Sequence, residues 1–107
     1  MTKIVTPDII ARVTMRSADA GGRTVGIPSV QFRCPLSING ELFDCRLLLN
    51  QVGFGLLPGS TADIPIKFLY LNLVQDMLIP GSRFTLWDMG DFADGTILDV
   101  LTAHKET

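Results

Sequence analysis

The sequence is poor in the residues that build metal, cofactor and covalent catalytic sites. Its 107 residues include two cysteines, one histidine, one tryptophan and one tyrosine. Two cysteines form neither a disulfide framework nor a four-ligand zinc site by themselves. The only histidine, His104, has no nucleophile in a supporting pattern, so we predict a surface side chain. The composition therefore predicts no catalytic residues, no metal and no cofactor, and hence no enzyme.

Charge of one sign and long apolar runs are also scarce. The net charge is −2, which argues against a broad attraction to phosphate backbones. No run approaches the about 18 apolar residues that span a membrane, and Met1–Pro7 lack the apolar part of a signal peptide. No Gly-x-x-x-x-Gly-Lys-Ser/Thr loop is present to hold a nucleotide. We expect a cytoplasmic protein that binds neither membrane nor nucleotide.

Apolar residues, in contrast, make up 47% of the chain, enough for the core of one domain of this length. Residues 8–16 alternate apolar and polar, which is typical of a half-buried strand. Further short strands follow between turn signals, with no linker, repeat or long helix. The sequence predicts one all-β domain over residues 1–107, a small antiparallel barrel or sandwich, with segments 1–7 and 102–107 flexible.

A hairpin is predicted over residues 31–49, with Asn39-Gly40 as its two-residue turn. This register places Cys34 opposite Cys45 and Pro35 opposite Asp44. It also gathers one apolar face, formed by Phe32, Cys34, Leu36, Ile38, Phe43, Cys45 and Leu47. Two interpretations of the cysteines stay open. They form a cross-strand disulfide or redox switch, or they pack as two buried thiols, which a reducing compartment favours.

Residues 64–74 are predicted to form a long strand that is apolar on both faces. Leu69, Leu71 and Leu73 share one face of this strand, opposite Ile66, Phe68 and Tyr70. A barrel strand needs only one apolar face, so we expect one row to be exposed as a partner or self-association surface, unless a strand bend or the chain termini cover it.

The last third of the chain is expected to form a late hairpin. Residues 83–87 read as a strand closed by the turn signal Met89-Gly90, and Asp94-Gly95 reads as a second tight turn before another strand over 96–101. Trp87 and Phe92 are expected to extend the apolar surface as aromatic anchors. Asp88, Asp91, Asp94 and Asp99 do not have the spacing of a calcium loop, so we interpret them as solvated charge.

The order of the turn signals resembles the C-terminal (third) β-barrel domain of elongation factor Tu. The motifs that carry the resemblance are Gly21-Gly22-Arg23 after an alternating strand, Gln31-Phe32 before Asn39-Gly40, Leu57-Pro58-Gly59-Ser60 before residues 64–74, and the strand from Arg83 to Met89. The resemblance covers roughly residues 8–101. It implies a stand-alone, closed, six-stranded antiparallel barrel without catalytic residues, and it makes Arg23 a candidate contact to RNA or another anion.

Two functions follow as hypotheses. The first is a non-enzymatic binding module, an adaptor, immunity-type or self-associating protein, that docks a protein or a second copy through Leu69, Leu71, Leu73, Trp87 and Phe92. The second is an RNA-binding module that retains a transfer RNA stem contact through Arg23, with Arg12, Arg16 and Arg33. Where the family has an arginine near the RNA, this chain has Asp91, so the RNA hypothesis ranks second.

Overall fold

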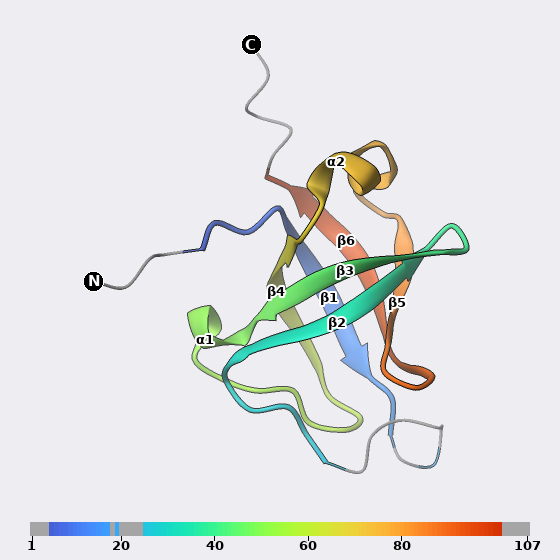
Figure 1. The fold of residues 1–107 in the computed structure, drawn as a ribbon. Coiled ribbons are helices and arrows are strands. Elements are labelled where there is room, and N and C mark those ends of the chain that lie inside the picture. Colours follow the sequence, from blue (N-terminus) through green and yellow to red (C-terminus); the bar gives the residue numbers. More distant parts are fainter. Residues whose placement is uncertain (1–4, 18, 20–24, 102–107) are drawn as a thin grey trace.

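The computed structural model describes residues 5–17, 19 and 25–101. Six strands and three short helical segments make up this part of the chain (Figure 1). They are β1 (Ile9–Met15), β2 (Gln31–Ile38), β3 (Glu41–Leu48), α1 (Leu49–Val52), β4 (Thr61–Phe68), α2 (Leu71–Val74), η2 (Gln75–Met77), β5 (Arg83–Trp87) and β6 (Asp91–Val100).

The strands close into one antiparallel barrel in the order β1-β4-β3-β2-β5-β6. This confirms the prediction of a small six-stranded antiparallel barrel. β2 and β5 share the fewest residue pairs of any two neighbouring strands: only Leu36 with Leu86 and Ser37 with Thr85. In Figure 1 the β2–β3 hairpin crosses in front of β1, and α2 lies at one end of the barrel.

The interior of the barrel follows from the alternation that the sequence shows in β1. Its four inward side chains are fully buried; they are Ile9, Ala11, Val13 and Met15. β1 lies between β4 and β6 in the barrel wall, and its inward side chains belong to the core. Burial of aliphatic and aromatic side chains from all six strands supplies the main driving force for closure.

The β2–β3 hairpin has the predicted register. Cys34 pairs with Cys45, Pro35 with Asp44, and Ile38 with Glu41. The turn residues Asn39 and Gly40 both have positive φ, 53° and 80°, as a two-residue type I′ turn requires. Both cysteines are buried and free, so they are thiols in this structure.

The prediction of one strand over residues 64–74 is wrong. β4 ends at Phe68, and the chain then bends and forms the single helical turn α2. β3 still pairs with Phe68, but the other partner strand, β1, begins only at Ile9, which pairs with Ile66. Beyond that pair the Asp8 carboxylate accepts the Phe68 N–H at 2.8 Å in place of a strand carbonyl, so the ladder stops there.

The prediction of a turn at Asp94-Gly95 is also wrong, because both residues lie inside β6. The β5–β6 turn is formed by Met89 and Gly90, both with positive φ. Gly95 is needed within the strand for another reason. A Cβ atom on Gly95 would overlap the ring of Phe84, the residue paired with it on β5.

Candidate functional site

An exposed apolar cluster near the predicted surface is formed by Leu42, Leu69, Tyr70 and Leu73, which we call the α2 patch. These side chains are 55%, 42%, 58% and 60% exposed, respectively. Three of them, Leu42, Tyr70 and Leu73, line a small hollow of about 130 Å³ together with Phe43 and Asp44. An apolar cluster of this kind is typical of a surface that another protein covers.

Backbone hydrogen bonds hold the α2 patch in place. The N–H of Leu69 donates to the carbonyl oxygen of Asp44 at 3.0 Å, and the N–H of Leu73 donates to that of Tyr70 at 3.1 Å. Val74, the last residue of α2, is fully buried and anchors the helical turn to the barrel. The patch therefore presents its side chains from fixed backbone positions.

Only some of the residues that the sequence predicted to form a partner surface are exposed near one another. Leu69 and Leu73 are exposed within the α2 patch, whereas Leu71 is half-buried and packs against the core. Trp87 is 39% exposed, but it lies at the end of β5, separated from β3 by β2. Arg23, the proposed RNA contact, and the Gly21-Gly22-Arg23 turn lie outside the described residues.

Phe92 is not the surface anchor that we expected, because it is only 2% exposed. Its ring packs edge-on against Phe32, with 6.3 Å between ring centroids and 82° between ring planes. The physical reason is a β-bulge. Leu86 pairs with Ala93 but Trp87 pairs with Asp91, so Phe92 is the extra residue, and both it and Ala93 are buried.

Sequence reasoning missed Leu42 and placed Tyr70 on the wrong side. The signal for Leu42 was available, because the predicted hairpin register puts it opposite Ser37 and out of phase with the apolar face of the hairpin. No such signal existed for Tyr70. Its exposure results from the bend after Phe68, which the strand-like composition of the segment conceals.

A second feature, which we call the cationic row, consists of three cationic side chains on the outside of β2, β3 and β4. Arg33 on β2 pairs with Arg46 on β3, and Arg46 pairs with Lys67 on β4. Lys67 has an ion pair, with its Nζ 3.2 Å from Oδ1 of the buried Asp8. Within the described part of the chain, neither arginine of the row has an ion pair or a side-chain hydrogen bond.

Two other arginines have a carboxylate partner on a neighbouring strand. Arg12 contacts Asp63 through Nε and Nη2, at 2.8 and 3.1 Å. Arg16 holds Asp94 in the same two-pronged way, at 2.9 and 2.8 Å. The hydrogen bonds from these guanidinium groups lower the pKa of both carboxyls below their usual value. Two arginines of the hypothetical RNA-binding set therefore already hold carboxylates.

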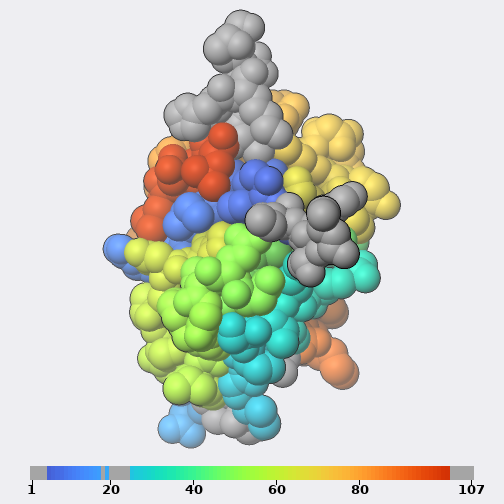
Figure 2. Space-filling model, turned by 90° about the vertical axis from the view of Figure 1, so that its left-hand side faces the viewer, coloured from blue at the N-terminus to red at the C-terminus, as the bar shows by residue number. Residues whose placement is uncertain are grey.

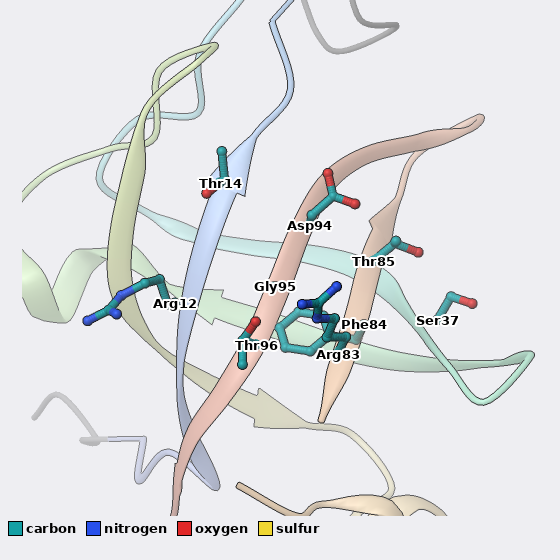
Figure 3. Close-up of a pocket in the computed structure, with 9 residues that line it drawn as sticks. All are labelled: Arg12, Thr14, Ser37, Arg83, Phe84, Thr85, Asp94, Gly95 and Thr96. Carbon is teal, nitrogen blue, oxygen red and sulfur yellow. The ribbon is translucent and has the colours of Figure 1, made fainter. Parts of the chain in front are cut away.

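A polar hollow of about 600 Å³ opens on the outside of β2, β5, β6 and β1. It is lined by Arg12, Thr14, Ser37, Arg83, Phe84, Thr85, Asp94, Gly95 and Thr96 (Figure 3). Figure 3 shows that the guanidinium of Arg12 points away from Asp94, towards β4, which carries Asp63. The charges of Arg12 and Asp94 are thus used by ion pairs. The remaining polar side chains of the lining are the guanidinium of Arg83 and the hydroxyl groups of Thr14, Ser37, Thr85 and Thr96.

An apolar hollow of about 550 Å³ lies where two loops meet. Figure 2 shows the green segment around residue 50 beside the cyan segment around residue 30, from which these loops continue. The lining of the hollow is Val25, Gly26, Ile27, Pro28, Phe54, Gly55 and Leu57. Two hydrogen bonds of 2.8 Å between Ile27 and Leu56 join the loops. Val25, the first residue of this lining, directly follows in the sequence residues 20–24, which are outside the described part of the chain, whereas every residue of the α2 patch is described.

The described residues contain neither a metal-binding cluster nor a membrane-spanning helix. Within residues 5–17, 19 and 25–101, no three or more histidine, cysteine or acidic side chains are grouped so that they could hold a metal ion. Over the same residues, no helix has the length and apolar character needed to cross a membrane.

The fold defines a small closed antiparallel β-barrel domain. A comparison with models of known protein families finds no match. A comparison with curated proteins finds no significant similarity. The resemblance to elongation factor Tu therefore continues to rest on the turn motifs, since a six-stranded barrel alone does not identify that family.

Proposed function

We propose that this chain is a non-enzymatic protein-binding module that docks its partner on the α2 patch. The observation that supports this most is the exposure of the four patch side chains, three of which, Leu42, Tyr70 and Leu73, line a shared hollow. Removing such side chains from water on binding contributes roughly 25 cal/mol for each Å² of apolar area. A tyrosine at the edge of an apolar cluster is also a frequent anchor of protein interfaces.

The residues around the α2 patch favour a protein over a nucleic acid. Asp44 lines its hollow, and a carboxylate at that place repels a phosphate backbone. Arg12 and Arg16, which the RNA hypothesis requires, are held by Asp63 and Asp94. RNA binding is the competing proposal, and among the described arginines of its set only Arg33 is not held by a carboxylate of the chain.

Site-specific photo-crosslinking tests the proposed function. A photoreactive phenylalanine analogue replaces Leu73 in the chain produced in its source organism, and the matched control carries the analogue at Leu57. These two leucines are comparably exposed, at 60% and 64%, but Leu57 lies in the loop hollow. We expect a discrete protein adduct from position 73 that is absent from position 57 and is lost in Tyr70→Asp.

The mass of the adduct identifies the kind of partner. An adduct of twice the chain's mass indicates a second copy, and any other discrete protein mass indicates a different partner. No adduct at position 73, or the same adducts at both positions, would contradict docking on the α2 patch. Circular dichroism of the purified Tyr70→Asp variant checks that its barrel is intact.

A further inference from the structure

The arginine pair of the cationic row is an arrangement that sheets ordinarily avoid. Arg33 and Arg46 are direct neighbours across the β2–β3 ladder, and Lys67 continues the row on β4. Like charges placed directly opposite each other destabilise a sheet. Elsewhere in the same barrel, Arg12 on β1 lies opposite Asp63 on β4 and forms an ion pair with it. The arginine pair of the cationic row has no such carboxylate opposite it.

We infer that the cationic row binds carboxylate groups of an acidic segment in the partner protein. Each guanidinium can accept a carboxylate in a two-pronged contact, as Arg12 and Arg16 do within the chain. Arg33 is exposed and Arg46 is half-buried, so both can be reached from outside the barrel. The missing counter-charge would come from the bound partner.

The row lies next to the α2 patch on the outer side of the same strand. Leu42, Asp44 and Arg46 alternate along β3 and point outward, while Phe43 and Cys45 between them point inward. Residues two apart on a strand are about 7 Å apart, so Arg46 is roughly 14 Å from Leu42. A partner with apolar anchors on the α2 patch would therefore bring nearby acidic residues over the arginines.

An acidic protein segment fits this row better than a nucleic acid. The row is three residues wide, and Asp8 already neutralises Lys67 at one end. Asp44 stands two residues before Arg46 on the same side of β3, where it would repel a continuous phosphate backbone. A few carboxylates can contact the arginines without covering Asp44.

The inference rests on the proposed function, but its experiment does not use the α2 patch. ¹⁵N-labelled chain is titrated at low salt with hexaglutamate, and in parallel with a short RNA stem. We expect hexaglutamate to shift the Nε–H signals of Arg33 and Arg46 and to bind at least fivefold more weakly to Arg46→Thr. The matched control, Arg83→Thr, removes an exposed strand arginine outside the row and should bind like the wild type.

Several results would overturn the inference. The first is that hexaglutamate binds equally well to the wild type and to Arg46→Thr. The second is that the RNA stem binds more tightly than hexaglutamate at the same salt concentration. The third is that hexaglutamate shifts the Nε–H signal of neither arginine. If the chain self-associates and Arg46→Thr abolishes this self-association, the row binds a second copy of the chain and not an acidic segment of another protein. A photo-adduct at position 73 alongside a failed titration would leave the protein-binding function standing and remove only the acidic partner.

A salt series provides a second, independent readout. If the two arginines repel each other, the melting temperature of Arg46→Thr relative to the wild type is highest at low salt and falls as salt screens the repulsion. A difference that is the same at all salt concentrations would contradict repulsion within the row. This comparison holds even if the shorter side chain loses some packing, because that loss does not depend on salt.

Discussion

The ring of Phe84 fills the space in which a side chain of Gly95 would stand. The two residues are paired across β5 and β6, and the glycine lies in the middle of the strand. The aromatic ring thus covers the backbone where a side chain is missing, and both residues are buried. The relationship explains why a dipeptide typical of turns, Asp94-Gly95, occurs in a continuous strand.

Gly95→Ala should therefore destabilise the barrel by about 1–3 kcal/mol, the usual cost of forcing extra atoms into a packed interior. Chemical denaturation measures the free energy of unfolding. The control is the same substitution in a Phe84→Leu background, where the smaller side chain leaves room and the added cost of alanine should shrink. An equal cost in both backgrounds would show that the ring is not the obstacle.

Phe92→Ala should cost about 3–5 kcal/mol of stability, the range for a large aromatic side chain in a core. Phe92 is 2% exposed and contacts Phe32 edge-on. Trp87→Ala, at a residue that is 39% exposed, should cost clearly less. Thermal or chemical unfolding of the two variants decides the matter. If Trp87→Ala proves the more damaging of the two, the assignment of Phe92 to the interior is wrong.

The Arg16–Asp94 pair should make a small, pH-dependent contribution to stability. The hydrogen bonds from Arg16 lower the pKa of Asp94 below its ordinary value of 3.8. The stabilisation is therefore fully present well above pH 3.8 and is lost as the pH falls below this value, through the lowered pKa of the folded state. Because the side chains are 32% and 54% exposed, we expect less than about 1 kcal/mol.

Denaturation of Arg16→Gln and the wild type across pH 2–7 (roughly the range over which carboxyl groups titrate) tests the pair. The difference between them should be constant near neutral pH and vanish at the acidic end. Arg83→Gln is the control, since no ion pair to Arg83 occurs among the described residues, and its difference should not follow this course. A wild-type advantage that grows towards acid would contradict the sign.

Cys34 and Cys45 should react with iodoacetamide only when the barrel opens. Both are buried and free, and the pKa of Cys45 is raised by its hydrogen bond with Cys34 and by burial, which keeps it in the unreactive thiol form. Mass spectrometry at pH about 8, near the ordinary thiol pKa, should find almost no native labelling and two labels in guanidinium. Rapid labelling of the folded chain would contradict this, and a chain unlabelled after unfolding would instead contain a disulfide.

Much of the fold could be predicted because its signals are local. The alternation of Ile9, Ala11, Val13 and Met15 predicted the buried face of β1, and Asn39-Gly40 fixed the register that pairs Cys34 with Cys45. Both patterns depend on residues close together in the chain. The closed barrel then follows from having several such strands with one apolar face each.

The errors come from contacts between distant parts of the chain. The end of β4 depends on Asp8, some sixty residues earlier in the sequence, whose carboxylate accepts the Phe68 N–H. The strand character of Gly95 depends on the Phe84 ring, and the burial of Phe92 depends on a bulge. No local sequence pattern indicates these long-range contacts. The sequence therefore predicted only two residues of the α2 patch, Leu69 and Leu73.

The cationic row was equally inaccessible to a reading of motifs. Arg33 appeared in the sequence only as one of several basic residues. Its position opposite Arg46 follows from the predicted hairpin register, but the third member, Lys67, joins only through the pairing of β3 with β4. The juxtaposition of this row with the α2 patch is a property of the closed barrel.

Docking of a protein on the α2 patch is tested best by comparing photo-crosslinking at positions 73 and 57 in the source organism. We expect a discrete protein adduct at position 73, none like it at position 57, and its loss in Tyr70→Asp. An absence of adducts at position 73, or identical adducts at both positions, would contradict docking on the α2 patch.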